Sequence, residues 1–361
     1  MMKRVYNFNP GPSALPLEVL KTAQEEMLDY KGVGMSVLEM SHRSKDFEAI
    51  LAEAKTLIKK HLQLPDGFHI LFLGGGASMQ FAMLPMNFLS QGQSADYIIT
   101  GSWAQKAASE AKLFGTVNTA ASSSEANFSY IPTQDQIKLD PSAQYVHVTT
   151  NNTIFGSEWS YLPETGNVPL ILDMSSDILS RRVDVSKTSF IYAGAQKNLG
   201  PAGVTLVIVK EDFAAKQKQG LPKILSYSTY IKEDSLYNTP PVYPIYITML
   251  TMRWIDSIGG MVEVEKRNNR KKELIYGAID NSGGYYKGTV RADSRSGMNV
   301  TIRMNTEELE AKFIAEAKSA GFIGLKGHRS VGGLRASTYN AVPVEAVEKL
   351  VEFMKDFQKK N

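Results

Sequence analysis

A lysine in an unusual setting is the clearest reactive group in the chain. Lys197 follows the apolar run 189–193 and is surrounded by small residues and glycines from Gly194 to Gly203. Small neighbours allow a flat ring to approach the backbone closely. Partial burial and nearby cations lower the pKa of a lysine amine and make it a nucleophile. A single lysine in a loop is usually exposed to solvent. The role of Lys197 therefore has to be inferred together with the other residues of the pattern.

Other residues suited to ligand binding follow further apolar runs. The turn Gly74–Ser78 enters a helical pattern and either presents free N–H groups to a phosphate or is only a tight turn. Trp103 either stacks on a heterocycle or packs in the core. Asn151–Thr153 supplies either ligand contacts or a polar turn. Asp173 ends an apolar run and either faces a cation or caps a helix.

In chain order these features are a phosphate cradle, an aromatic ring, a carboxylate and a lysine. Pyridoxal 5'-phosphate (PLP) needs all four, because a lysine holds it and an acid faces its protonated ring nitrogen. The combination predicts a PLP site with Lys197 as attachment point and Asp173 as the acid. The glycine turn is not a Walker A loop, since no Gly-Lys-Ser/Thr follows, and Met79 breaks the dinucleotide fingerprint.

The elements that must position these residues alternate between apolar runs and helical patterns. Such alternation predicts an open, mostly parallel α/β sheet. In sheets of this kind, ligands bind beyond the carboxyl ends of the strands. The expected strands are 68–73, 96–100, 144–150, 168–173, 189–193 and 203–209, and the expected helices are 47–61, 79–89 and 103–114.

The pattern changes after Gly259 and Gly260, which indicates a smaller α+β domain. Its expected helices are 261–279, 306–320 and 344–357, and its expected strands are 298–304 and 333–338. The preceding segment 221–244 is rich in Tyr, Pro and Ser and has little periodicity. A loop of that length in a compact domain is usually functional or part of an interface.

The composition narrows the class of protein. A chain of 361 residues suggests about two domains, and 43% hydrophobic with 21% charged residues is typical of a soluble globular protein. The absence of cysteine excludes disulfides, zinc–thiolate sites and a cysteine nucleophile, and we expect no metal site.

Charge and hydropathy argue against a nucleic-acid or membrane partner. The net charge of +3 is too small to indicate nucleic acid, and the basic run 266–272 lies among glutamates, which predicts a solvated helix face. The N-terminus has no secretory h-region, and no stretch approaches the ~20 apolar residues of a membrane span. We therefore expect a cytoplasmic protein.

Seven segments strongly resemble the phosphoserine aminotransferases, a group of the class-V aminotransferases. The likeness extends over essentially the whole chain, and the lysine segment and the His-Arg motifs are its most specific parts. The segments are Asn7–Pro12, Ser41–Arg43, Gly74–Ser78, Asp173–Ser176, Tyr192–Asn198, Asn238–Pro241 and Gly327–Arg335.

The resemblance implies a PLP-dependent transferase of fold type I that forms a homodimer. It implies a large PLP-binding domain at 17–258 and a small domain made of 1–16 and 259–361. The implied reaction is reversible amino transfer between L-glutamate and 3-phosphohydroxypyruvate, giving 2-oxoglutarate and O-phospho-L-serine, a step of serine biosynthesis. Members of the group often also accept 4-phosphohydroxy-L-threonine, which belongs to pyridoxine biosynthesis.

The resemblance also implies site residues, position by position. Lys197 would form the Schiff base, Asp173 would pair with the pyridinium nitrogen and Trp103 would stack on the ring. The other cofactor contacts would be Thr153 to the phenolic oxygen, Ala77, Ser78 and Gln196 to the phosphate, and Asn238 and Thr239 from the neighbouring subunit. The substrate would be bound by His42, Arg43, His328, Arg329 and Arg335. One departure is visible, because some family members carry an arginine where this chain has Ser78.

Two other classes of protein compete with this interpretation. One is a related PLP enzyme, such as an alanine–glyoxylate aminotransferase or a cysteine desulfurase. The missing cysteine removes the cysteine-dependent desulfurase, and two His-Arg pairs in a chain with five histidines favour a substrate that is anionic at both ends. The other is a non-catalytic binding protein that kept the fold, against which the retained Lys197 and Asp173 argue.

Overall fold

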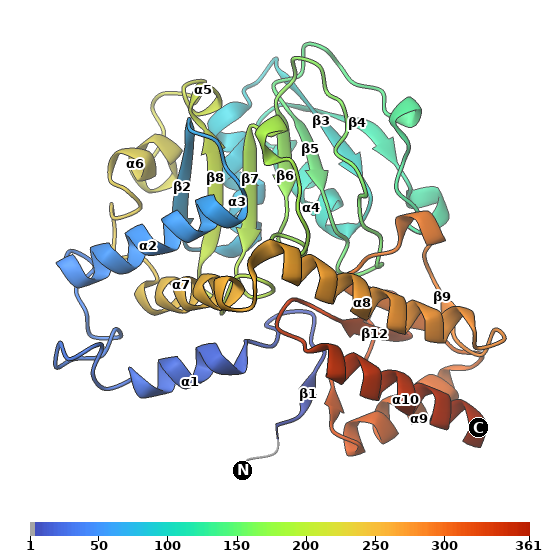
Figure 1. The fold of residues 1–361 in the computed structure, drawn as a ribbon. Helices are drawn as coiled ribbons and strands as arrows, with labels where there is room; N and C mark the ends of the chain where they lie inside the picture. The colour runs from blue at the N-terminus through green and yellow to red at the C-terminus, as the bar shows by residue number, and fades with distance from the viewer. Residues whose placement is uncertain (1–3) are drawn as a thin grey trace.

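A seven-stranded sheet forms the larger part of the computed structural model, which describes residues 4–361 (Figure 1). Only β8 runs antiparallel to its neighbours in this sheet; the other neighbouring strands are parallel. The predicted mostly parallel α/β sheet is therefore confirmed. In spatial order the strands are β2 (Phe68–Leu73), β8 (Thr205–Lys210), β7 (Phe190–Gly194), β6 (Leu170–Asp173), β5 (Val146–Thr149), β3 (Ser94–Ile99) and β4 (Thr116–Ser122).

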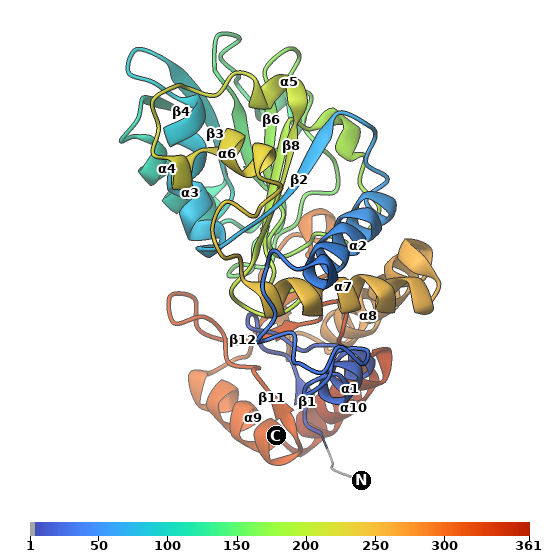
Figure 2. The ribbon, with the colours of Figure 1, turned by 90° about the vertical axis from the view of Figure 1, so that its left-hand side faces the viewer.

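Helices cover both faces of the large sheet. Helices α3 (Gly76–Phe88) and α4 (Ser102–Ala111) pack on one face, and α2 (Lys45–His61) and α7 (Val242–Ser257) pack on the other (Figure 2). Burial on both faces explains why the central strands read as near-continuous apolar runs. The remaining helices of this part are α1 (Leu17–Glu25), α5 (Glu211–Ala214) and α6 (Tyr227–Lys232).

A smaller α+β part packs beneath the large sheet, as the sequence predicts (Figure 1). Its antiparallel sheet has the order β12 (Leu334–Ser337), β10 (Asn299–Arg303) and β9 (Lys287–Gly288). Its helices are α8 (Gly260–Asp280), α9 (Glu307–Ser319) and α10 (Val344–Lys360). Strand β1 (Tyr6–Asn7) pairs in parallel with β11 (Phe322–Ile323), so an N-terminal segment joins this part of the fold.

Three elements differ from the sequence predictions. Strand β4 was not expected, because this edge strand is half exposed and its residues TVNTAAS form no apolar run. The segment 221–244 is not one irregular loop, since it contains α6 and the first turn of α7. Helix α7 is buried over most of its surface and therefore lacks the amphipathic period that reveals a helix.

The prediction that the basic run 266–272 forms a solvated helix face is wrong for one residue of α8. Lys271 is fully buried rather than solvated, and its Nζ donates to the carbonyl oxygens of Thr338 (2.8 Å), Tyr339 (2.8 Å) and Val342 (3.1 Å). Burial lowers the pKa of Lys271 to about 7, while three carbonyl acceptors favour its charged form. The sequence pattern correctly predicts that Lys271 lies on a helix. Its burial results from the segment after β12, which packs against this side chain and supplies its hydrogen-bond acceptors.

We predict that Lys271→Met lowers the free energy of unfolding by about 2–4 kcal/mol, because buried acceptors lose their donor. Urea denaturation measures this change. The matched control is Lys266→Met on the same helix, where the side chain is 79% exposed, and we expect a change within about 0.5 kcal/mol. Equal effects of the two substitutions would contradict the structural role given to Lys271.

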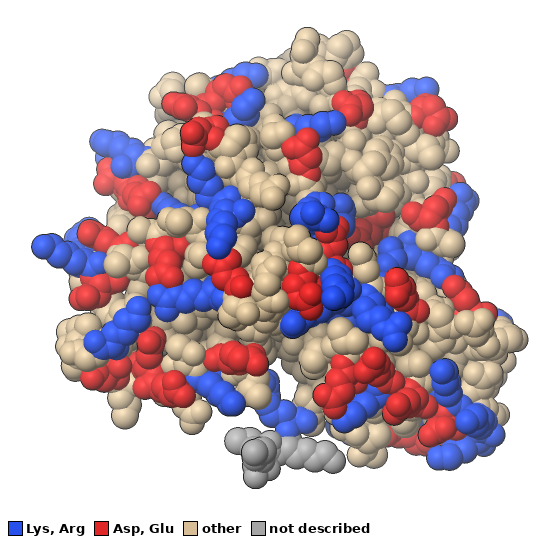
Figure 3. Space-filling model, viewed as in Figure 1, with Lys and Arg blue, Asp and Glu red and all other residues tan. Residues whose placement is uncertain are grey.

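The surface carries both signs of charge. On the face drawn in Figure 3, lysine and arginine side chains are interspersed with aspartate and glutamate. Within residues 4–361, no helix is both long and apolar enough to cross a membrane.

Candidate active site

Seven of the nine predicted cofactor-binding residues lie at or just after strand ends at one edge of the large sheet. Strands β2, β3, β5, β6 and β7 run in the same direction, so their carboxyl ends lie together. The glycine turn follows β2, Trp103 follows β3, Thr153 follows β5, Asp173 ends β6 and Lys197 follows β7.

Lys197 lies at the centre of this edge. Its Nζ donates a hydrogen bond to Thr153 Oγ1 at 2.7 Å, and its carbonyl oxygen accepts one from Ser13 Oγ at 2.6 Å. Burial lowers the pKa of Lys197 to about 8; the charge of Asp173 opposes this shift and that of Arg335 adds to it. A lysine with this pKa supplies the neutral amine near neutral pH that nucleophilic attack requires.

Asp173 is a buried carboxyl group beside this lysine. It is 4% exposed, and its Oδ1 accepts hydrogen bonds from Ser175 N (3.0 Å) and Ser175 Oγ (2.6 Å). Burial raises the pKa of Asp173, whereas Ser175, the charge of Lys197 and a hydrogen bond from Tyr192 lower it. A carboxylate in this position is best satisfied by a cation placed against it, and a protonated pyridine nitrogen is one.

Behind Asp173 lies a buried pair that the sequence analysis missed. Tyr192 is the neighbour of Asp173 across β6 and β7, and its hydroxyl lies 2.8 Å from His147 Nε2. Burial lowers the pKa of His147 to about 3, so the ring is neutral. The other ring nitrogen, His147 Nδ1, has no hydrogen-bond partner among residues 4–361.

The glycine turn forms the start of α3. Gly75 has a φ of +83°, a conformation that favours glycine, and the first turn of the helix carries no acidic residue. Ala77 is half-buried and Ser78 is exposed, while Gln196 is half-buried beyond the end of β7. Free N–H groups at the start of a 13-residue helix suit an anion such as a phosphate.

Trp103 lies in the first turn of α4. The side-chain amide of Asn152 holds the backbone at the start of this turn. Asn152 Nδ2 donates to the carbonyl oxygen of Thr100 at 2.6 Å, and the Asn152 side chain leaves no room for a Cβ at Gly101. The Nζ of Lys106 lies 4.5 Å from the centroid of the Trp103 ring. Lys106 is not among the predicted site residues, although its i, i+3 spacing from Trp103 on a predicted helix is a usable signal.

Three cations, Lys106, Arg329 and Arg335, lie with His328 in a basic cluster built from two parts of the fold. Arg335 lies on β12, is 6% exposed and donates from Nη1 to the carbonyl oxygen of Thr153 at 3.0 Å. Burial lowers the pKa of His328, and the charges of Arg335, Arg329 and Lys106 lower it further. The cluster therefore provides a positive field beside Lys197, suited to an anionic substrate.

Four predicted residues are not brought to Lys197 within one chain: His42, Arg43, Asn238 and Thr239. Arg43, Asn238 and Thr239 are exposed, and His42 is half-buried. Asn238 and Thr239 line a cavity of about 310 Å³ together with Gly74 of the glycine turn. Over residues 4–361, no hydrogen bond or ion pair links any of the four to Lys197, Thr153 or Asp173.

Comparison with known proteins defines the class of this enzyme. Residues 5–350 match the family described as aminotransferase class-V. The chain belongs to the class-V aminotransferases, which are PLP-dependent enzymes, so the predicted cofactor is confirmed.

Within that family, similar proteins that share about half of their sequence with this chain include phosphoserine aminotransferases. The chain is 55% identical, over the full length of both proteins, to a phosphoserine aminotransferase from Lysinibacillus sphaericus. The solved structure of phosphoserine aminotransferase from Bacillus circulans subsp. alkalophilus matches with a TM-score of 0.98 at 54% identity, covering 99% of each chain. PLP-bound phosphoserine aminotransferase from Trichomonas vaginalis matches with a TM-score of 0.92 at 38% identity, covering 98% of this chain and 100% of that one.

Proposed function

We propose that this enzyme transfers the amino group of L-glutamate to 3-phosphohydroxypyruvate, giving 2-oxoglutarate and O-phospho-L-serine, in serine biosynthesis. The observation that carries the proposal is the grouping of a half-buried lysine of lowered pKa, a buried carboxyl group and a basic cluster with two arginines at one sheet edge. The full-length likeness to phosphoserine aminotransferases supports the choice of substrates. The alternative with alanine and glyoxylate gains no support from these relatives. We also propose the 4-phosphohydroxy-L-threonine pair of pyridoxine biosynthesis as a second substrate pair.

The residues at the sheet edge fit PLP by their chemistry. We assign covalent attachment to Lys197, the pyridinium nitrogen to Asp173, the ring face to Trp103 and the phenolic oxygen to Thr153. Ala77, Ser78 and Gln196 are assigned to the phosphate. The buried carboxyl group without a directly bonded cation and the acid-free start of α3 are the features that support this fit. When bound, PLP supplies an electron sink for the charge released at the substrate Cα.

The chain's own residues bind the substrate and move its proton. With PLP held at this site, the amine of Lys197 would accept the Cα proton of the substrate and then return it as an acid. The Arg335 guanidinium suits the α-carboxylate, because its fork matches two carboxylate oxygens and its Nη1 is held by the Thr153 carbonyl group.

The distal end of each substrate is also anionic, a γ-carboxylate in L-glutamate and a phosphate in 3-phosphohydroxypyruvate. We assign this end to the pairs His42–Arg43 and His328–Arg329, together with Lys106. Lys106 adds a cation beside the Trp103 ring in a chain that has Ser78 where some family members have an arginine. One positively charged pocket can therefore accept both substrates in turn.

We propose a homodimer in which the neighbouring subunit contributes Asn238, Thr239, His42 and Arg43 to each site. Two observations support this: three of these residues are exposed, and the segments that carry them also carry exposed apolar side chains. Such side chains are typical of a protein interface. They are Leu28 (86% exposed), Val33 (37%), Met35 (40%), Leu38 (61%) and Tyr237 (38%).

We further propose a domain division at 17–258 against 1–16 with 259–361, and a cytoplasmic location. Phe8 packs in one hydrophobic cluster with residues of α8, α9 and α10, which supports joining the N-terminal arm to the C-terminal part. The start of α8 supports the boundary less well, because Met261 and Val264 pack in a cluster of the large sheet.

Two measurements test the proposed function. The first compares amino transfer from L-glutamate to 3-phosphohydroxypyruvate with transfer from alanine to glyoxylate; activity with the second pair alone would refute the proposal. The second reduces the PLP-loaded enzyme with borohydride and maps the pyridoxyl group by peptide mass spectrometry. Attachment at any residue other than Lys197 would refute the site.

We predict that Arg43→Ala raises KM for both L-glutamate and 3-phosphohydroxypyruvate by about 10- to 100-fold, since a hydrogen bond to a charged group contributes about 1.5–3 kcal/mol. Steady-state kinetics with each substrate varied measure the effect. The control is Lys45→Ala, an exposed cation two residues away, which should leave both values unchanged. Unchanged KM values for Arg43→Ala would remove this residue from the site.

A further inference from the structure

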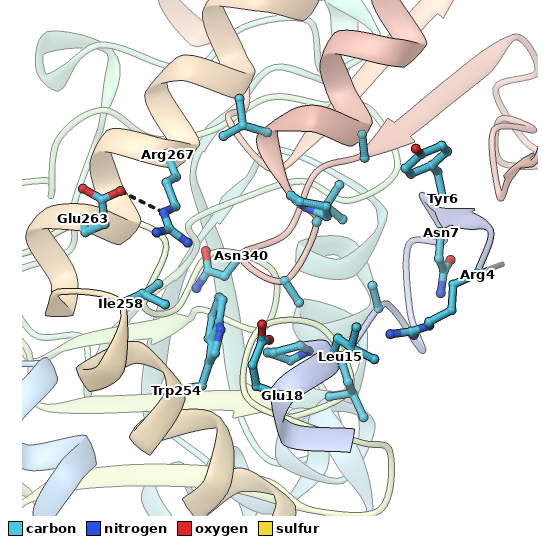
Figure 4. Close-up of a pocket in the computed structure, with 18 of the residues that line it drawn as sticks. Arg4, Tyr6, Asn7, Leu15, Glu18, Trp254, Ile258, Glu263, Arg267 and Asn340 are labelled. Carbon is cyan, nitrogen blue, oxygen red and sulfur yellow. Dashed lines mark hydrogen bonds and ion pairs between the residues drawn. The ribbon is translucent and has the colours of Figure 1, made fainter. Parts of the chain in front are cut away.

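A second cavity lies away from the strand ends. It has a volume of about 830 Å³ and is bounded by the N-terminal arm, the end of α7, the first turns of α8 and the start of α10 (Figure 4). None of the residues assigned to PLP or substrate lines it. A space of this size accommodates a small organic molecule.

The walls of this cavity combine apolar and cationic groups. Leu15, Trp254 and Ile258 are among the apolar lining residues (Figure 4). The charged lining residues are Arg4, Lys266, Arg267 and Arg270 against Glu18 and Glu263, an excess of two positive charges. An apolar wall with excess cations is complementary to a molecule that has an apolar body and one anionic group.

Arg267 is the guanidinium best placed to receive the anion. In Figure 4 it lies near Asn340 and Ile258, and its Nε donates to Glu263 Oε1 at 2.9 Å. This bond uses one edge of the guanidinium fork and leaves the Nη groups for a ligand. The start of α10 adds partial positive charge to the opposite wall, because Val344 opens that helix.

The arm that lines this cavity also touches the catalytic lysine. Its residues 4–7 and 14–18 face the cavity, and the segment between them reaches the active site. Ser13 Oγ donates to the Lys197 carbonyl oxygen at 2.6 Å, and a Cβ at Gly11 would lie 3.4 Å from Lys197 Cγ. Tyr339, which precedes the lining residue Asn340, donates its hydroxyl proton to the Pro10 carbonyl oxygen at 2.8 Å. A ligand between these walls therefore contacts both ends of a segment that packs on Lys197.

We propose that this cavity binds a small amphipathic anion, an aryl or branched alkyl carboxylate, and that the N-terminal arm transmits its occupancy to Lys197. This inference goes beyond the proposed aminotransferase function. It is tested by ligand binding and by absorption of the bound cofactor rather than by amino transfer. A failure of this proposal can therefore be told apart from a failure of the proposed aminotransferase function.

Isothermal titration calorimetry of the PLP-loaded enzyme with 4-phenylbutyrate tests the binding. We expect one molecule per chain with a Kd of about 0.1–1 mM, and at least about tenfold weaker binding of the uncharged analogue 4-phenylbutan-1-ol. Arg267→Gln should weaken 4-phenylbutyrate binding about tenfold, and Val344→Trp, which fills the cavity, should abolish it. The matched control is Arg182→Gln, whose arginine also bonds a glutamate of α8 through Nε (2.7 Å) but lies outside the cavity.

Absorption of the bound cofactor tests the link to Lys197. Saturating 4-phenylbutyrate should shift the pH midpoint of the visible absorption band in the parent enzyme and leave it unchanged in Val344→Trp. An unaltered midpoint in the parent would overturn the coupling. Binding that survives both Arg267→Gln and Val344→Trp, or that responds to Arg182→Gln as strongly as to Arg267→Gln, would overturn the cavity as the site.

Discussion

Lys197→Ala will lower kcat/KM for amino transfer by about 10⁴-fold or more. The lysine both attaches the cofactor and moves the Cα proton in the proposed mechanism, and general acid–base catalysis alone contributes about 10²–10⁴-fold. Steady-state assays with L-glutamate and 3-phosphohydroxypyruvate measure the loss. Equilibrium dialysis against PLP shows whether the variant still retains the cofactor without a covalent bond.

The pKa of Lys197 adds a pH dependence to this prediction. With a pKa of about 8, roughly one amine in ten is neutral at pH 7, so attachment of PLP to the cofactor-free enzyme should accelerate about tenfold per pH unit below 8 and level off above it. A solvated lysine with the ordinary pKa of 10.5 would continue to accelerate up to pH 10. Stopped-flow absorption at several pH values separates the two cases.

The same shift predicts how pH changes the stability of the cofactor-free fold. Between pH 8 and 10.5 the unfolded chain holds a proton on Lys197 that the folded chain has released, so the unfolded state binds more protons. The Lys197 contribution to the free energy of unfolding therefore rises with pH in this window. Lys197→Ala should flatten the rise, whereas the control Lys187→Ala, an exposed lysine paired with Glu164, should not.

The grouping of Asp173 and Lys197 at one sheet edge was predictable because the strands that carry them are buried on both faces. Such strands appear as apolar runs, and parallel strands bring residues that follow different runs to one edge. Asp173 and Lys197 were therefore recognisable as neighbours although 24 positions separate them in the sequence. The roles proposed for Asn238 and Arg43 came only from the resemblance, because no pattern within one chain indicates the contact across a dimer that we propose.

The missed residues share a physical cause, which is contact between segments far apart in the chain. His147 lies on a predicted strand, but its partner Tyr192 lies on another strand. Lys106 contacts Trp103 on its own helix, but its effect on His328 joins two distant parts of the chain. The burial of Lys271 likewise depends on carbonyl groups that follow β12. Periodicity describes one element at a time, so it cannot assign such contacts.

Asp173→Asn will lower kcat by about 10²- to 10⁴-fold in the proposed mechanism. Removing one partner of a buried ion pair costs about 3–5 kcal/mol, and each 1.36 kcal/mol corresponds to a factor of ten in rate. The substitution keeps the size of the side chain and an acceptor for the two Ser175 bonds, so it removes chiefly the charge opposite the pyridine nitrogen. The exposed Asp212, 68% accessible and 3.2 Å from Lys210, provides the control Asp212→Asn.

The stability of the same variant distinguishes loss of the charge from loss of the fold. Burial raises the pKa of Asp173 above its ordinary value of 3.8, so in the cofactor-free enzyme the folded state binds more protons than the unfolded state just above that value. The contribution of Asp173 to stability therefore falls as pH rises through this window, and at pH 7 the buried charge is a cost. Asp173→Asn removes that cost, and the Tm of the cofactor-free variant should equal or exceed that of the parent.

With PLP present, the parent enzyme should have a higher Tm than Asp173→Asn. A ligand stabilises the folded state according to its concentration relative to Kd, and the variant binds the cofactor more weakly because its ring nitrogen faces no anion. The increase in Tm on adding PLP should therefore be smaller in Asp173→Asn than in the parent. A variant that keeps more than a tenth of the parent kcat, or gains as much stability from PLP, would show that the carboxylate of Asp173 does not face the cofactor nitrogen.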